Sequence, residues 1–159
     1  MIQKVLFICT GNTCRSLMAE YLFKKMAKEN GLEIEVRSAG VSIGINSQIP
    51  VLTLRVLEKE GISPEGHVVT PLTNTLVDWA DLILAMETPH ANRVLDFGPA
   101  ARGKVFLLTE YTNAGNTALE NKYGIPDPFG GSREAYETCI AKIKGCLGRL
   151  VEMLKGEKE

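Results

Sequence analysis

A short, continuous apolar run near the N-terminus constrains the fold more than any other feature of this chain. Residues 5–8 read Val-Leu-Phe-Ile, which is rich in β-branched and aromatic side chains, and a Thr-Gly-Asn cluster follows Cys9. A run of this length and composition is typical of a strand that is buried on both faces. The segment therefore predicts a central strand of a parallel sheet.

Strand and helix patterns alternate along the rest of the chain. After residue 16, apolar residues recur at four-residue intervals, and Gly31 stands where a helix would stop. Further strands are predicted at 33–38, 80–86 and 105–108, and further helices at 50–60, 88–97 and 132–155. Residues 109–131 show no clear period, and such a long aperiodic stretch in a compact domain is usually functional.

This alternation predicts a three-layer α/β fold, with a four-stranded parallel sheet and helices on both faces in a flavodoxin-like arrangement. With 159 residues and 45% hydrophobic content, the chain has material for one core, so residues 1–159 are expected to form a single domain. Ligands of such sheets bind outside the carboxyl ends of the strands. The loop after Ile8 lies at that edge.

Composition excludes several classes of function. The 18 basic and 19 acidic residues nearly cancel, so nothing indicates binding to nucleic acid or to an anionic membrane. The apolar stretch before Cys9 is too short for a signal peptide or a membrane span. The four cysteines, at 9, 14, 139 and 146, lack the spacing of most structural zinc sites. We therefore expect a cytoplasmic monomer without a metal or other cofactor.

The loop over residues 9–16 carries the chemistry and reads Cys-Thr-Gly-Asn-Thr-Cys-Arg-Ser. It follows a predicted strand and opens a predicted helix, so its backbone N–H groups and the positive end of the helix can converge on a tetrahedral oxyanion. Gly11 supplies conformational freedom, and Asn12 tolerates the left-handed region that such a loop often needs. The sequence predicts a phosphate-binding loop.

The residue types in this loop suit nucleophilic catalysis. Cys9 would lie beneath the anion site, where the positive potential stabilises the nucleophilic thiolate. Arg15 can present two parallel donors to two phosphate oxygens, and Ser16 can donate its hydroxyl to the cysteine sulfur. The alternative for Cys9 is a small buried hydrophobe at the end of a strand.

Several segments together resemble the low-molecular-weight protein tyrosine phosphatase family. They are residues 5–20, Arg37-Ser38-Ala39-Gly40, residues 80–86 and Asp127-Pro128. The resemblance covers nearly the whole chain. It implies the phosphotyrosine protein phosphatase I fold and hydrolysis of a phosphorylated protein substrate through a phosphocysteine intermediate.

The resemblance also implies roles for individual residues. Cys9 would be the nucleophile, Arg15 the phosphate binder and Asp127 the general acid. The remaining phosphate-binding loop positions are Thr10, Gly11, Asn12, Thr13, Cys14 and Ser16. Asn12, Ser16, Ser38 and His67 match a hydrogen-bond network that in the family holds the loop in shape.

Asp127 suits the role of acid on chemical grounds. Transfer of the phosphoryl group to Cys9 expels an oxygen or nitrogen that needs a proton, and a carboxylic acid on a loop over the pocket can deliver it. The same carboxylate can later take a proton from the attacking water. The prolines on both sides stiffen its backbone. The alternative is an ordinary turn aspartate before proline.

Two positions bear on the substrate. Thr13 stands where the family usually has an aliphatic residue, and Phe129-Gly130 stands where paired aromatics often wall a deep phenyl pocket. Both departures match the bacterial branch that resembles protein arginine phosphatase. Thr13 would narrow the pocket against a planar phenol, so we expect hydrolysis of phosphotyrosine, phosphoarginine or both, with a preference for phosphoarginine. The alternative is that Thr13 only packs.

Two other functions fit the same loop less well. Arsenate reductases of this fold need more cysteines, usually in the middle of the chain, and none lies between Cys14 and Cys139. Cys139 and Cys146 share one apolar helical stripe, which favours packing. A non-catalytic phosphobinding module would need neither Cys9 nor Asp127.

Two further residues are interpreted from the sequence alone. Cys14 is expected to be a resolving thiol that traps oxidised Cys9 as a reversible disulfide, and the alternative is a second wall of the anion site. His90 is expected to be structural, as a lone histidine on a helix surface.

Overall fold

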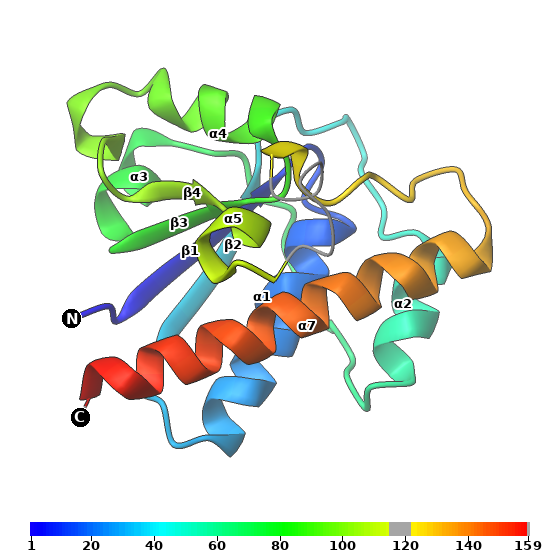
Figure 1. The fold of residues 1–159 in the computed structure, drawn as a ribbon. Helices are drawn as coiled ribbons and strands as arrows, with labels where there is room; N and C mark the ends of the chain where they lie inside the picture. The colour runs from blue at the N-terminus through cyan, green and yellow to red at the C-terminus, as the bar shows by residue number, and fades with distance from the viewer. Residues whose placement is uncertain (115–121, 159) are drawn as a thin grey trace.

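A computed structural model describes residues 1–114 and 122–158, and its centre is a four-stranded sheet (Figure 1). The strands are β1 (Lys4–Cys9), β2 (Glu35–Gly40), β3 (Leu82–Ala85) and β4 (Val105–Leu107). Their order is β2-β1-β3-β4, and every neighbouring pair is parallel. The predicted fold class is confirmed, and β2 begins two residues later than the alternation suggested.

β1 occupies an interior position because both of its faces are apolar. Val5 and Phe7 point into one hydrophobic core, while Leu6 and Ile8 point into the other. All four side chains are 0% exposed. Successive side chains of a strand point to opposite faces, so a continuous apolar run supplies both cores at once.

The helices form one layer on each face of the sheet. The first layer contains α1 (Arg15–Glu29), α2 (Val51–Glu58), α5 (Leu108–Thr112) and α7 (Arg133–Lys158). The second contains α3 (Asn74–Trp79), α4 (Thr88–Leu95) and a 3-10 turn over Pro99–Ala101. In Figure 1, the long α7 crosses the face that α1 also covers.

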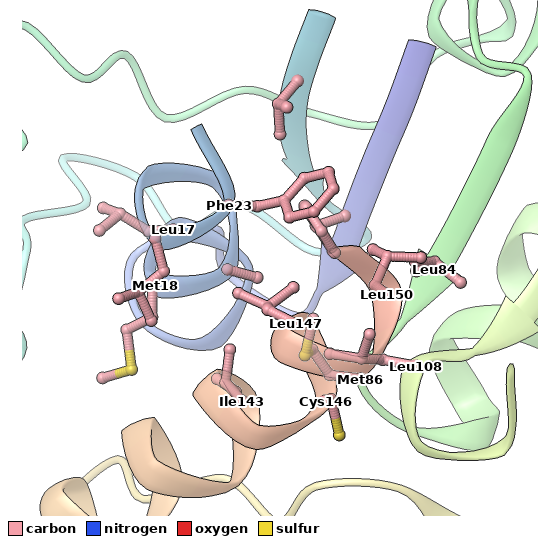
Figure 2. Packing of buried hydrophobic residues seen from close by; sticks show 14 of the residues in the cluster. Leu17, Met18, Phe23, Leu84, Met86, Leu108, Ile143, Cys146, Leu147 and Leu150 are labelled. Atoms are coloured by element: carbon pink, nitrogen blue, oxygen red, sulfur yellow. The ribbon is translucent and has the colours of Figure 1, made fainter. Parts of the chain in front are cut away.

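The larger core lies between α1, α7 and the sheet, and Figure 2 shows part of it. Phe23 of α1 meets Phe7 edge-on, with ring centroids 5.8 Å apart. Leu147 and Leu150 of α7 fill the space towards the sheet. The predicted stripe of α7 is buried here, and it comprises Cys139, Ile143, Cys146 and Leu150. The two late cysteines therefore lie inside a packed core.

Two short helices were not predicted. α3 begins after Thr73, whose hydroxyl accepts a hydrogen bond from the backbone N–H of Leu76. α5 occupies the start of the stretch that showed no period, and Thr112 bonds back to the carbonyl of Leu108 within it. Residues 115–121 of that stretch lie outside the described residues. Within the described ranges, no helix has the length and apolar character needed to cross a membrane.

Candidate active site

The loop that the sequence singled out lies at the carboxyl edge of the sheet. Cys9 is the last residue of β1 and is 2% exposed, and Arg15 is the first residue of α1. β1 is paired with β2 so that Cys9 lies opposite Gly40. The Cys9 sulfur and the Ser16 hydroxyl oxygen are 2.9 Å apart. The strand and the helix therefore hold the thiol and the guanidinium at the two ends of one short loop.

Asn12 organises the loop from inside. Its φ of 57° places it in the left-handed region, as predicted, and its side chain is 0% exposed. Its amide nitrogen donates to the hydroxyls of Ser16 and Ser38, both at 2.8 Å. Its amide oxygen accepts from the backbone N–H of Thr70 at 3.0 Å, and its carbonyl lies 3.0 Å from His67 Nε2. Every polar group of the Asn12 side chain is thus satisfied.

These bonds fix the direction of the Ser16 proton. Ser16 accepts a hydrogen bond from Asn12, so its own proton is free to point at the Cys9 sulfur. Ser38 likewise accepts from Asn12 and donates to the carboxylate of Glu20 at 2.5 Å. The network therefore aims one hydroxyl donor at the Cys9 sulfur.

The glycine that the loop needs is Gly40, not Gly11. Gly11 does not have a positive φ, and a Cβ there would meet only the Thr13 hydroxyl, at 3.7 Å. The expectation that Gly11 supplies special conformational freedom is therefore wrong. A Cβ on Gly40 would lie 2.5 Å from the Thr10 carbonyl oxygen and 3.0 Å from the Asn12 nitrogen. β2 ends in glycine because the loop passes directly against it.

Arg15 is a buried cation that has several partners. It is 2% exposed, and its Nη1 donates to the carbonyl of Ile125 at 2.9 Å and to the carboxylate of Glu87. Its Nη2 lies 3.6 Å from Asp127 Oδ2 and 3.5 Å from Thr10 Oγ1. Burial would lower the pKa of Arg15, but the hydrogen bond to Glu87 and the nearby acidic groups raise it instead. The guanidinium is therefore held charged beside the thiol.

A glycine also explains how Asp127 reaches the site. Gly124 forms an antiparallel bridge with Glu87, and the Ile125 N–H donates to the Met86 carbonyl at 2.7 Å. Gly124 has a φ of 99°, and a Cβ there would lie 1.9 Å from the Met86 oxygen. This contact holds the chain before Asp127 against the end of β3. The Asp127 side chain is 45% exposed, so its carboxyl can exchange protons with solvent.

The residues predicted to set specificity lie on the loop and beside Asp127. Thr13 is half-buried within the loop. Phe129 is 71% exposed, and its N–H donates to Asp127 Oδ1 at 3.0 Å. Cys14 precedes α1 and is 6% exposed, and burial raises the pKa of its thiol well above the usual value.

His90 differs from its prediction as a surface histidine, because it is 4% exposed and lies at the site. Its Nδ1 accepts from the backbone N–H of Glu87 at 3.0 Å, and its Nε2 lies 2.8 Å from Thr10 Oγ1. Burial, with help from the charge of Arg15, lowers the pKa of His90 to about 4. The signal in the sequence was the pair Glu-x-x-His directly after a buried strand, which resembles a capping box.

The site brings together a buried thiol, a fixed hydroxyl donor, a buried guanidinium and a half-exposed carboxyl. Such a set can bind a tetrahedral anion, displace a leaving group from it and supply that group with a proton. In residues 1–114 and 122–158, no group of three or more His, Cys, Asp or Glu side chains is arranged to hold a metal ion.

Comparison with known proteins agrees with this geometry. The family model for low molecular weight phosphotyrosine protein phosphatases matches residues 4–159. A protein-arginine-phosphatase of Bacillus subtilis is 38% identical over 154 residues, which cover 97% of this chain and 98% of the relative. A solved mutant of the arginine phosphatase YwlE with a phosphorylated active-site serine has a TM-score of 0.86 and 37% identity, and the match covers 96% of each chain. The tyrosine phosphatase Wzb from Escherichia coli K30, in complex with sulphate, has a TM-score of 0.81 and 31% identity, with 97% of this chain and 99% of Wzb covered.

Proposed function

Since the chain belongs to the low molecular weight phosphotyrosine protein phosphatase family and is a hydrolase of phosphorylated proteins, we propose that it acts through a phosphocysteine on Cys9 and prefers phosphoarginine. The observation that carries the mechanism is the 2.9 Å contact between the Cys9 sulfur and a Ser16 hydroxyl whose acceptor side is occupied by Asn12. That contact gives the thiolate a fixed donor at the base of an anion site.

In the first step, the Cys9 thiolate attacks phosphorus. A sulfur–phosphorus bond forms, and the bond from phosphorus to the substrate nitrogen or oxygen breaks. Arg15 and the backbone N–H groups of the loop neutralise the oxygens of the transferring group. The Asp127 carboxyl gives its proton to the leaving group, and the half-exposed position of Asp127 suits this transfer.

In the second step, water attacks the phosphocysteine. The Asp127 carboxylate takes a proton from that water, the new oxygen–phosphorus bond forms, and the sulfur–phosphorus bond breaks. The departing Cys9 sulfur carries the negative charge, which the Ser16 proton stabilises. Inorganic phosphate then leaves, and both side chains return to their starting protonation states.

Two observations support phosphoarginine as the substrate. The B. subtilis relative is named as a protein-arginine-phosphatase, and it matches nearly the whole chain. Thr13 is a branched residue that is half-buried in the loop, and the acid is followed by the single exposed aromatic Phe129 and a glycine. A nitrogen is a far better leaving group from phosphorus when it is protonated, so this substrate also depends strongly on Asp127.

The test is a comparison of kcat/KM on phosphoarginine and phosphotyrosine peptides for the native protein and Thr13→Ile. We expect the native protein to prefer phosphoarginine and the variant to shift towards phosphotyrosine. The matched control is Thr75→Ile, which makes the same change at an exposed position of α3. A native preference for phosphotyrosine that Thr13→Ile leaves unchanged would refute the substrate assignment.

We also propose that residues 1–159 act as one domain and as a monomer. Cys9, Arg15 and Asp127 all come from this one chain, so no second subunit is needed to complete the site. Light scattering at the concentration of the activity assay measures the mass directly, and a dimer as the active species would contradict this proposal.

A further inference from the structure

We propose that His90 is a positioning residue that, through Thr10, aims a hydroxyl proton at an oxygen of the phosphoryl group bound over Cys9. The inference rests on the proposed function, because it assigns a donor to the same anion site. Under this inference, the side-chain hydroxyl of Thr10 binds the phosphoryl group directly.

The contacts of His90 determine its tautomer. The backbone N–H of Glu87 lies 3.0 Å from Nδ1 and can only donate, so Nδ1 must hold a lone pair. In the neutral ring the proton is then on Nε2, which lies 2.8 Å from Thr10 Oγ1. The imidazole therefore donates to Thr10, and the hydroxyl oxygen accepts.

The environment of His90 keeps this arrangement stable. The ring is 4% exposed, and the positive charge of Arg15 opposes protonation. In a protonated ring, Nδ1 would carry a hydrogen that faces the Glu87 N–H, so two donors would meet and the hydrogen bond would be lost. Near neutral pH, His90 thus acts as a fixed donor rather than as an acid or base.

The hydrogen bonds of Thr10 leave its proton for a ligand. A hydroxyl oxygen has two acceptor positions and one proton. His90 Nε2 occupies one acceptor position, and Arg15 Nη2 approaches the oxygen at 3.5 Å. Among the described residues, these are the only two hydrogen-bond partners of the Thr10 hydroxyl. Its proton must therefore point away from both.

The position of Thr10 indicates where that proton is used. Thr10 follows Cys9 directly and is exposed, and its hydroxyl lies beside the same Arg15 nitrogen that faces Asp127. An anion held by Arg15 over the Cys9 sulfur has its oxygens next to this hydroxyl. Hydrogen bonds to a charged acceptor are stronger than those between neutral groups, so the donor adds to the binding of a phosphate dianion.

The experiment measures binding of inorganic phosphate and hydrolysis of p-nitrophenyl phosphate. Thr10→Val removes the hydroxyl at nearly constant size, and we expect it to weaken phosphate binding on the order of 10-fold. Thr10→Ser keeps the hydroxyl and should stay within about threefold of the native protein. The matched control is Thr88→Val, which removes a hydroxyl bonded to the Lys122 carbonyl in the same region. Thermal unfolding of each variant checks that it is folded.

His90 is tested through its dependence on Thr10. His90→Leu should weaken phosphate binding in the native background but change it less than about twofold in the Thr10→Val background, because the two residues act as one unit. His90→Gln, which retains a side-chain donor, should recover part of the loss. Nitrogen NMR should show a protonated Nε2 and an unprotonated Nδ1 on His90 at neutral pH.

The outcomes separate this inference from the proposed function. If the native protein neither binds phosphate nor hydrolyses p-nitrophenyl phosphate, the proposed function fails. If the native protein does both and Thr10→Val binds phosphate equally well, only the inference fails. Additive effects of His90→Leu and Thr10→Val, or a proton on Nδ1, would also overturn it.

Discussion

Acidification from pH 7 to pH 4 is expected to remove the stability that His90 contributes to the folded state. A histidine in the unfolded chain has a pKa near 6.5, whereas burial and the charge of Arg15 lower the pKa of His90 to about 4 in the fold. Above pH 6.5 the ring is neutral in both states, so its contribution is fully present. As the pH falls towards 4, the unfolded chain takes up the proton and the folded chain does not. The contribution is therefore lost on acidification.

The magnitude follows from the difference between the two pKa values. Each pKa unit corresponds to about 1.4 kcal/mol, so the full effect between pH 6.5 and pH 4 is roughly 3 kcal/mol. The ring is 4% exposed, so solvent screens it little. This loss is a large fraction of the stability of an ordinary domain.

The assay is urea unfolding of the native protein and His90→Gln at a series of pH values from 7 to 4. Both proteins retain Thr10 and Glu87, the hydrogen-bond partners of residue 90. The remaining residues are the same in both proteins, so the difference between the two free energies of unfolding isolates His90. We expect the advantage of the native protein to shrink by roughly 3 kcal/mol on acidification. A difference that stays constant across this range, or that grows, would refute the argument.

Three further predictions concern the loop. Gly40→Ala should cost about 1–3 kcal/mol of stability and most of the phosphatase activity, because its Cβ would lie 2.5 Å from the Thr10 carbonyl oxygen. Urea unfolding measures the loss of stability, and kcat measures the loss of activity. The control is Gly148→Ala, whose added Cβ would meet nothing within 4 Å. An unchanged Gly40→Ala would contradict the close approach. Ser16→Ala should lower kcat by about 10- to 100-fold and leave Asn12 without one acceptor, and stopped-flow kinetics should show that breakdown of the phosphocysteine slows. An unaffected breakdown step would exclude Ser16 from that step. Cys14→Ser should lose the recovery of activity by thiols after peroxide treatment, and recovery equal to that of the native protein would exclude Cys14 as the resolving thiol.

The sequence predicted the parts of the fold and site that depend on local pattern. The apolar run of β1 is only a few residues long, yet it is enough to indicate a strand buried on both faces. The loop up to Ser16 is one contiguous stretch of the chain, so its motif is visible in the sequence. Long helices such as α7 show their period clearly. α3 and α5 have only six and five residues, too few for a period to be visible.

The missed residues depend on contacts between distant segments. Glu87 and His90 meet Arg15 and Thr10 only because β3 lies beside β1, and Gly124 is required only because the chain crosses Met86 there. No local sequence pattern reveals that β3 pairs with β1. The same reason explains why the sequence pointed to Gly11, and not to Gly40, as the glycine that the loop requires. The Thr10 and Asn12 backbone atoms that approach Gly40 belong to the loop after the neighbouring strand β1.

The most direct test of the mechanism is to trap the covalent intermediate. The native protein and Cys9→Ser would be mixed with a phosphoarginine peptide, quenched within milliseconds, and analysed by peptide mass spectrometry under conditions that preserve phosphorus–sulfur bonds. We predict that phosphate is attached to Cys9 in the native protein during turnover and that Cys9→Ser produces no inorganic phosphate at the native rate. Turnover without a phosphorylated Cys9, or undiminished turnover by Cys9→Ser, would contradict the mechanism.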